Sequence, residues 1–236
     1  MKILVLIPAR GGSKRLPGKN LLPLGGRPLI EWSIRVIEDV LDVKHVLVST
    51  DDSDIAAVAR ALGAMVPWLR PTHLATDTAT SVDVALHAYD WYEAEFGAVD
   101  GIMLLQPTSP LRSRRTIEEG IRLFKEGNQA IVGVSLAGTH PLRALKLEGE
   151  NIIPWSSWDS FSVRSQDLPK AYALTGSFYL ISPSELRSGL SFFPTDAKPL
   201  LQENLYELVD IDRESDYLLA QALLPFMDSD HPFLDD

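Results

Sequence analysis

The stretch IPARGGSKRLPGKNL, residues 7–21, decides the fold, because it follows directly on the apolar run ILVLI at residues 3–7. Such a short run, rich in β-branched residues, is typical of a strand buried on both faces. The next ten residues, 10–19, hold three glycines and four cations. Glycines let backbone N–H groups approach an anion, and cations neutralise it. The stretch therefore predicts a first strand that ends in a polyphosphate-binding loop.

Neither common phosphate-binding motif fits this loop. A Walker A loop places four residues between its glycine and the Gly-Lys-Ser/Thr group. Here the spacing from Gly12 to Gly18 is one residue too long, and Asn20 stands where the magnesium-binding hydroxyl would be. The dinucleotide fingerprint G-x-G-x-x-G is also absent.

Apolar runs alternate with helical patterns along the chain, which indicates an α/β fold with a mostly parallel sheet covered by helices. Strands are predicted at 3–7, 45–49, 65–69, 101–105, 130–136, 177–181 and 205–211, and helices at 28–41, 53–62, 81–96, 115–124 and 213–224. The pattern weakens after residue 136, where 140–149 could form one strand of a hairpin. We expect one domain over residues 1–236, with an extension at about 137–193 inserted in it.

The composition limits the function. The net charge of −10 argues against non-specific nucleic-acid binding, which needs a basic face. The first 20 residues nevertheless hold five cations and no acid, which suits a small polyanion such as a nucleoside triphosphate. The absence of cysteine excludes disulfides and thiolate catalysis. Because no apolar run approaches about 18 residues and the chain enters a strand at once, we expect no membrane segment, no signal peptide and a cytoplasmic location.

A pair of carboxylates is a candidate metal site. Asp210 and Asp212 alternate with Val209 and Ile211, so in a strand both carboxylates point to one side. Neighbouring acids repel each other unless a cation lies between them, and a divalent metal serves this best. A solvated acidic edge, or Asp212 as a helix N-cap, is the alternative from the spacing alone.

Two further loops are expected beside the carboxyl ends of strands, where ligands bind in parallel sheets. Residues 70–81 read RPTHLATDTATS and are dense in hydroxyls and turn formers, so on physical grounds they predict a surface loop that ends near a helix cap at Ser81. Residues 106–112 read QPTSPLR, and their prolines stop the preceding strand. A rigid loop without function is the alternative for this second segment.

The wording IPARGGSKRLPGKN resembles the signature of the acylneuraminate cytidylyltransferases, the CMP-sialic acid synthetase family, and RPTHLATDTATS, LLQPTSPLR and DIDRESD match later family motifs in order. The resemblance implies a Rossmann-like three-layer sandwich and transfer of CMP from CTP to the anomeric 2-hydroxyl of a nonulosonic acid, with release of pyrophosphate. It gives Mg²⁺ as the cofactor, held by Asp210 and Asp212, which are catalytic together with Arg10 and Lys19. The residues implied for CTP binding are Arg10, Gly11, Gly12, Ser13, Lys19, Asn20, Arg70, Ala79 and Ser81.

The acceptor half departs from the family pattern. Ser165 stands where an arginine is usual, Ala173 replaces a second arginine and Thr175 replaces an asparagine, so two charged contacts to the acid are missing or moved. The residues expected at the sugar acid are Gln106, Arg143, Arg164, Gln166, Tyr179, Phe192 and Phe193. Relatives dimerise through the segment that corresponds to 137–193, and the phenylalanine pair reaches the neighbouring subunit's site, which implies a homodimer here.

Other interpretations stay open from the sequence. The same chemistry could act on legionaminic acid, pseudaminic acid, a deaminated nonulosonic acid or the eight-carbon acid Kdo. A catalytically inactive nucleotide-binding module is a second class, and an NTP-hydrolysing switch, which lacks Walker spacing here, is a third.

Overall fold

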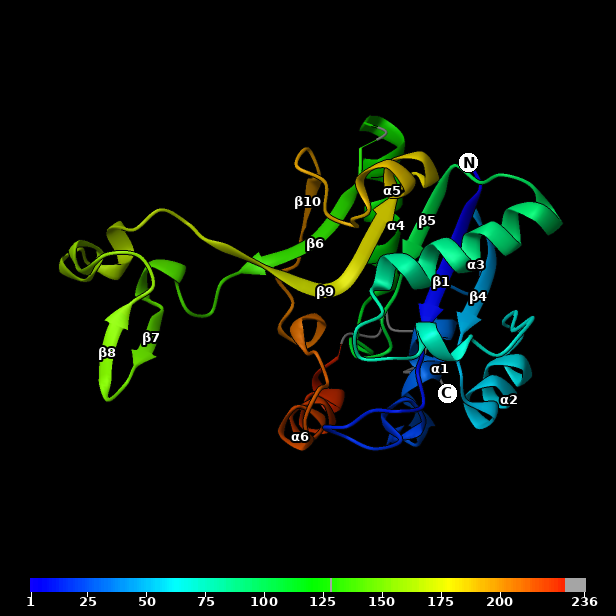
Figure 1. The fold of residues 1–236 in the computed structure, drawn as a ribbon, viewed down its shortest axis with the longest axis horizontal. Coiled ribbons are helices and arrows are strands. Elements are labelled where there is room, and N and C mark those ends of the chain that lie inside the picture. The colour runs from blue at the N-terminus through cyan, green and yellow to red at the C-terminus, as the bar shows by residue number, and fades with distance from the viewer. Residues whose placement is uncertain (128, 228–236) are drawn as a thin grey trace.

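The computed structural model describes residues 1–127 and 129–227, and its centre is a sheet with helices on both faces (Figure 1). Within the described residues this sheet has six strands in the order β10-β6-β9-β5-β1-β4. Their bounds are β1 Ile3–Pro8, β4 Val43–Ser49, β5 Gly101–Leu104, β6 Ile131–Leu136, β9 Tyr172–Ile181 and β10 Lys198–Leu201. Only β9 runs antiparallel to its neighbours, β5 and β6. The predicted mostly parallel mixed sheet is confirmed.

The remaining elements cover the sheet or connect its strands. The α-helices are α1 Leu29–Arg35, α2 Ser53–Ala61, α3 Ser81–Phe96, α4 Arg114–Gly127, α5 Pro183–Gly189 and α6 Glu214–Leu223. Two small antiparallel ladders pair β2 Pro23–Leu24 with β3 Arg27–Pro28, and β7 Leu145–Glu148 with β8 Asn151–Pro154. Short 3₁₀ helices are η1 Lys19–Leu21, η2 Thr72–Leu74, η3 Pro141–Arg143, η4 Trp158–Ser162, η5 Ser165–Asp167, η6 Leu205–Leu208 and η7 Leu224–Phe226. None of these described helices is long and apolar enough to cross a membrane.

The apolar alternation of β1 builds the three layers. Ile3, Val5 and Ile7 are fully buried in a cluster with residues of α1, α2 and α4. Leu4 and Leu6 face the opposite layer and pack with residues of α3 and α5. Because side chains alternate across a strand, one fully buried strand holds both layers together. This arrangement fixes β1, and hence the loop that follows it, in the middle of the sheet.

Helix caps set where the site loops end. Asp52 accepts hydrogen bonds from the amides of Asp54 and Ile55 and starts α2 just after β4. Thr80 and Asp83 form a reciprocal capping box at the start of α3. Ser81, expected near a cap, is the first residue of this helix. Both helices therefore begin at the carboxyl-end edge of the sheet.

Two sequence-based assignments are wrong in part. The strand predicted at 65–69 is reduced to a single bridge between Met65 and Leu47, because Pro67 has no N–H to continue a ladder. The helix predicted at 28–41 ends at Arg35, and tight turns follow up to Asp39, whose φ of 59° is left-handed. The residues that follow Arg35, up to Asp39, therefore lie in turns, although their apolar spacing is that of a helix.

The strand predicted at 205–211 is also wrong. Its first half is the 3₁₀ helix η6, and the following residues are extended without a neighbouring strand. The edge position beside β6 belongs to β10 instead, which the sequence analysis missed because Pro199 and the loop-like residues before it hide the strand. A proline is tolerated in β10 because it is an edge strand.

The segment between β6 and β9 leaves the body of the molecule. In Figure 1 these two strands run outward together, and the β7–β8 hairpin lies at the far end of the projection. Leu147, Trp155 and Trp158 on this projection are 78%, 68% and 59% exposed. β9, α5 and the residues up to 193 return to the main body, so the projection is narrower than the predicted extension at 137–193.

Candidate active site

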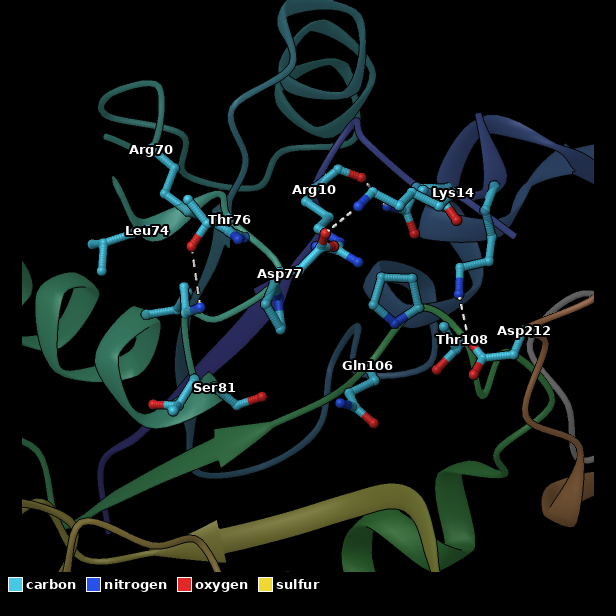
Figure 2. Close-up of a pocket in the computed structure, with 18 of the residues that line it drawn as sticks. Arg10, Lys14, Arg70, Leu74, Thr76, Asp77, Ser81, Gln106, Thr108 and Asp212 are labelled. Atoms are coloured by element: carbon cyan, nitrogen blue, oxygen red, sulfur yellow. Dashed lines mark hydrogen bonds and ion pairs between the residues drawn. The ribbon is translucent and has the colours of Figure 1, made fainter. Parts of the chain in front are cut away.

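A cleft of about 610 Å³ lies at the carboxyl ends of β1 and β5. The two strands are neighbours, while the chain passes from β1 to β4 on one side and to β5 on the other, so the cleft lies where the strand order reverses. Three loops meet there: 9–22 after β1, 70–81 before α3, and 105–113 after β5 (Figure 2). Nine predicted site residues line it, namely Arg10, Ser13, Lys19, Asn20, Arg70, Ala79, Ser81, Gln106 and Asp212.

Four cations of the first loop pair with two carboxylates from distant segments. Asp77 accepts from Arg10 at 2.8 Å and from Lys14 at 2.5 Å. Asp212 accepts from Lys19 at 2.9 Å and from Arg15 at 2.8 Å. In Figure 2 Asp77 lies beside Arg10 and Lys14, and the dashed line at Asp212 marks its ion pair with Lys19. The cations predicted to bind phosphate therefore converge on one cleft.

The loop backbone is held by internal hydrogen bonds. The Gly11 amide donates to the Asp51 carboxylate at 3.0 Å, and the Ser13 amide donates to the Gly11 carbonyl at 2.9 Å. Asn20 is buried and its side-chain amide donates to the Arg10 carbonyl at 2.9 Å. Two of the amides expected at the phosphates are thus engaged within the protein, and Asn20 fixes the loop. Gly12 and Gly11 do not themselves line the cleft.

The loop at 70–81 closes the opposite wall of the cleft. Arg70 is buried, and its guanidinium donates to both the hydroxyl and the backbone carbonyl of Ser49 at the end of β4. Burial lowers the pKa of Arg70, and the nearby Asp51 carboxylate opposes that shift. The Ala79 amide donates to the Thr76 hydroxyl at 3.2 Å, which shapes the turn before α3. This wall combines one cation with several hydroxyl and backbone groups.

The segment 209–212 brings Asp212 into the cleft. Val209 and Ile211 are buried under α1, while Asp210 and Asp212 point away from that core. The alternation expected of a strand therefore holds although no strand forms. A hydrogen bond from Lys19 is the main cause of the lowered pKa of Asp212, so this group is a carboxylate near neutral pH. Asp210 does not line the cleft, but its charge acts on Tyr179 and Arg112.

The loop after β5 is tied to the carboxylate segment. The Ile211 amide donates to the Thr108 carbonyl at 2.7 Å, so the loop and the segment lie side by side. Gln106 and Thr108 line the cleft between the first loop and β9 (Figure 2). Arg112, at the end of this loop, is fully buried below it.

The expected sugar-acid residues lie in two places. Arg143, Arg164 and Gln166 belong to the projection and do not line the cleft of their own chain. Arg143 donates to the carbonyls of Phe161 and Val163 and stacks on the Phe161 ring. Arg164 forms a surface pair with Asp167 at 2.8 Å, so neither arginine faces the cleft of the same chain.

Tyr179 and the phenylalanine pair belong to the main body. The Tyr179 ring lies 6.0 Å from the ring of Phe192, which is 7% exposed and part of the core. Phe193 is 56% exposed. Burial is the main cause of the raised pKa of Tyr179. The role of these three residues at a sugar acid stays a prediction.

The sequence profile of the cytidylyltransferase family matches residues 4–148. This range includes the first strand, the basic loop and both other loops of the cleft. The chain belongs to the cytidylyltransferase family. It is a nucleotidyltransferase, as the resemblance predicted.

Individual relatives align with this chain over nearly its whole length. It is 35% identical to the CMP-N,N'-diacetyllegionaminic acid synthase of Legionella pneumophila, over 95% of this chain and 97% of that protein. It is 32% identical to a pseudaminic acid cytidylyltransferase of Campylobacter jejuni, over 94% and 96%. The N-acylneuraminate cytidylyltransferase of Escherichia coli is 30% identical over 93% of this chain but only 51% of that protein.

Solved structures share the fold. A CMP:2-keto-3-deoxy-manno-octonic acid synthetase in complex with CTP superposes with a TM-score of 0.69 at 18% identity, covering 96% of this chain and 99% of that one. A 4-diphosphocytidyl-2C-methyl-D-erythritol synthase from Anaerococcus prevotii gives 0.64 at 12% identity, covering 95% and 96%. These likenesses confirm the predicted three-layer architecture.

Sequence reasoning missed several residues that shape the cytidylyltransferase cleft. Asp77 binds two cations of the loop, and its position in a turn-rich segment gave no signal for this. Lys14 and Arg15 were part of the cationic stretch but were not assigned to the site. Thr108 lines the cleft from a segment already marked as a ligand-side loop. Contacts between residues so far apart in the chain are outside the reach of spacing arguments.

Proposed function

We propose that this cytidylyltransferase transfers CMP from CTP to a nonulosonic acid and releases pyrophosphate, and that its acceptor is a diacetamido acid of the legionaminic or pseudaminic type. The cleft at the carboxyl ends of β1 and β5, where four cations pair with Asp77 and Asp212, carries the first part of the proposal. Two relatives named for such acids match along nearly their full lengths and support the second part. The departures at Ser165, Ala173 and Thr175 also favour an acid other than N-acetylneuraminic acid.

We expect the contacts to the sugar acid to differ at one of these departures, Thr175. The Thr175 hydroxyl hydrogen bonds to Gln202 at 2.5 Å and lies 3.0 Å from the Ser177 hydroxyl, inside the protein. A threonine hydroxyl engaged in this way is a poor partner for a sugar acid. The asparagine usual at this position has a longer side chain, which extends further from the backbone. We therefore expect this pocket to accept a different pattern of polar groups on the acid.

The reaction joins the anomeric 2-hydroxyl oxygen to the α-phosphorus of CTP while the bond from that phosphorus to the pyrophosphate oxygen breaks. Catalysis of such a transfer is mostly positioning and charge neutralisation. Arg10, Lys14 and Lys19 would hold the triphosphate, and Lys19 would meet the charge that grows on the leaving pyrophosphate. Arg70 and the backbone near Ala79 would hold the nucleoside on the other wall.

The residues near Asp212 fit a magnesium ion. Mg²⁺ is bound through one or two carboxylates together with substrate phosphates and water. Asp210 and Asp212 supply two carboxylates from alternate positions. Among the described residues no group of three or more His, Cys, Asp or Glu side chains could hold a metal ion, so the remaining ligands would be phosphate oxygens and water. When bound, the ion would supply charge neutralisation at the phosphates and lower the pKa of the attacking hydroxyl. Asp212 would have to exchange its ion pairs with Lys19 and Arg15 for this role.

A homodimer is a third part of the proposal. The projection exposes a set of large apolar side chains that a single chain leaves in solvent: Leu136, Leu145, Leu147, Ile152, Trp155, Trp158 and Leu174. Exposed apolar surface of this kind marks an interaction site. Since Arg143 and Arg164 lie far out on the projection, a partner subunit could bring them to its neighbour's cleft. Sedimentation that shows a fully active monomer would contradict this arrangement.

A panel of substrates tests the function. Purified enzyme with Mg²⁺ is given CTP, UTP, ATP or GTP together with N,N'-diacetyllegionaminic acid, pseudaminic acid, N-acetylneuraminic acid or Kdo, and the CMP-sugar and pyrophosphate are measured. We expect CTP to be preferred over UTP, and over both purine nucleotides more strongly, with a diacetamido acid as best acceptor. Pyrophosphate release with no acid would indicate a hydrolase instead, and no product with any pair would indicate an inactive binding module.

A further inference from the structure

Arg112 is a charged side chain that the reaction outlined above leaves unused. It is 1% exposed and lies below the loop after β5, on the side of the sheet end where Gln106 enters the cleft. Burying a guanidinium is costly unless each of its donors finds an acceptor. The hydrogen-bond partners of Arg112 therefore show which parts of the protein its guanidinium holds together.

The guanidinium joins three elements. It donates to the Gln106 carbonyl at 2.6 Å, to the Ser177 carbonyl on β9 at 3.0 Å and to the Ser33 hydroxyl on α1 at 2.8 Å. Two of these hydrogen-bond partners are backbone carbonyls, and they belong to the segments expected to bind the sugar acid. Their positions relative to each other are thus set by one rigid, planar group.

The Gln106 side chain lies against the same segment of β9. A Cβ atom added at Gly176 would lie 3.2 Å from the Gln106 side-chain oxygen, so the glycine leaves room for this amide. Gly176 has a φ of +75°, at an irregularity where the register between β6 and β9 shifts. Arg112 binds the next residue, Ser177, and therefore fixes both the backbone of Gln106 and the surface against which its side chain rests.

A buried carboxylate completes the arrangement from the other side. Glu207 is 2% exposed and accepts from the Ser113 amide at 3.1 Å, from the Thr116 hydroxyl at 2.7 Å and from the Gln202 side chain at 3.3 Å. It comes three residues before Asp210. The loop after β5 is consequently held at its beginning by Arg112 and at its end by Glu207, next to the segment that carries Asp210.

Charge links the two groups. Burial lowers the pKa of Arg112 to about 9, and the negative charges of Glu207 and Asp210 act in the opposite direction. The guanidinium therefore stays protonated near neutral pH, with carboxylates as its counter-charges. An arginine rather than an apolar residue at this place is explained if its hydrogen bonds set a geometry that the reaction needs.

We propose that Arg112 and Glu207 are positioning residues that hold Gln106 and the irregular part of β9 in register with the Asp210 segment, and so select and orient the sugar acid. Both residues are buried, and neither lines the cleft. The proposal rests on the proposed function, because it assigns Gln106 to the acceptor. Two buried groups that are distant from each other in the sequence would then determine how the sugar acid is placed.

The test separates acceptor from nucleotide. In R112M we expect the KM for N,N'-diacetyllegionaminic acid to rise roughly ten- to hundredfold, since small displacements of a positioning group have effects of this size. The KM for CTP should change by less than about threefold, because the loops at 10–19 and 70–81 make no hydrogen bond to the guanidinium. E207Q, which keeps an acceptor oxygen but loses the charge, should raise the acceptor KM by a smaller factor.

Two controls exclude a merely structural role. S33A removes one partner of the same guanidinium on α1, so it should lower the melting temperature without moving the acceptor KM. In a double-mutant cycle, Q106A should lower acceptor affinity strongly in the wild type and little in R112M, because the effect of Gln106 depends on Arg112. If R112M fails to fold, E207Q and its cycle with Q106A provide the same comparison.

The outcomes are distinct. Parallel changes in both KM values, or additive effects of R112M and Q106A, would overturn the proposal while leaving the proposed function intact. Wild-type enzyme that makes no CMP-sugar with any acid of the panel would overturn the proposed function before any variant is measured. Selective loss of affinity for the sugar acid, with coupling between Arg112 and Gln106, would support the positioning role of Arg112.

Discussion

Two adjacent glycines of the basic loop should respond in opposite ways to the same substitution. A Cβ atom on Gly11 would lie 2.5 Å from a carboxylate oxygen of Asp52 and 2.9 Å from its Cβ. A Cβ atom on Gly12 would meet nothing within 4 Å. The φ of neither glycine lies in the left-handed region, so backbone strain does not distinguish them. G11A therefore tests how closely the loop packs on α2, and G12A is its matched control.

The size of the effect follows from what Asp52 does. Its carboxylate caps α2 through the amides of Asp54 and Ile55. Turning it away removes a cap worth about 1 kcal/mol, and leaving it in place forces overpacking of about 1–3 kcal/mol. Replacing glycine by alanine returns about 0.4–1 kcal/mol through the unfolded state. G11A should thus lose about 0.5–2 kcal/mol, or a few degrees of melting temperature, while G12A gains about 0.4–1 kcal/mol.

Urea unfolding of both variants and of the double variant G11A/D52G measures this. Glycine is itself a tolerable N-cap, so D52G alone should be mild, and it should remove most of the effect of G11A. The KM for CTP should rise roughly tenfold in G11A, since a displaced loop moves Arg10 and Ser13 with it. Equal stabilities of G11A and G12A, or additive effects of G11A and D52G, would refute the close packing of loop and helix.

Three further predictions concern the cofactor, the pH dependence and the assembly. D212A, and less strongly D210A, should lower kcat by roughly 10²–10³ with CTP binding retained, and near-normal turnover of both at saturating Mg²⁺ would contradict the metal role. His45 and His87 have pKa values below the ordinary value of 6.5 mainly through burial, so the folded state binds fewer protons and stability should fall as the pH drops from about 7.5 to 5.5; a double glutamine variant should flatten this slope in urea titrations. W155D on the projection should shift the enzyme toward monomers in sedimentation with an unchanged melting curve for the monomer, and an unchanged association state would exclude this surface as the interface.

Much of the fold could be predicted because its strongest signals are local. The apolar run of β1 and the cationic glycine-rich loop after it are read from neighbouring residues, and both lie where the sequence placed them. The alternation of Asp210 and Asp212 with Val209 and Ile211 also holds, since burial of the two apolar side chains enforces it without a strand. The pattern therefore predicted which side chains of the segment are buried, but it predicted the wrong element.

The remainder depends on contacts between distant segments. No spacing indicates that Asp77 pairs with Arg10, or that Glu207 binds the amide of Ser113, because these pairs are 67 and 94 residues apart. β10 was missed for a related reason: an edge strand with a proline has little pattern of its own and is defined by its neighbour β6. The direction of the projection likewise depends on the pairing of β6 with β9, which local propensity does not encode.

The ion pairs of the cleft also bear on how CTP is recognised. Four neighbouring cations would repel one another, and the carboxylates of Asp77 and Asp212 offset two of the four positive charges. A triphosphate has to displace these carboxylates, so its affinity reflects the difference between phosphate and carboxylate as partners rather than the full attraction. A ligand with one phosphate reaches fewer of the cations and leaves most of the internal pairs in place. Because Asp77 belongs to the loop at 70–81, occupation of the phosphate positions is physically tied to the wall expected to hold the base.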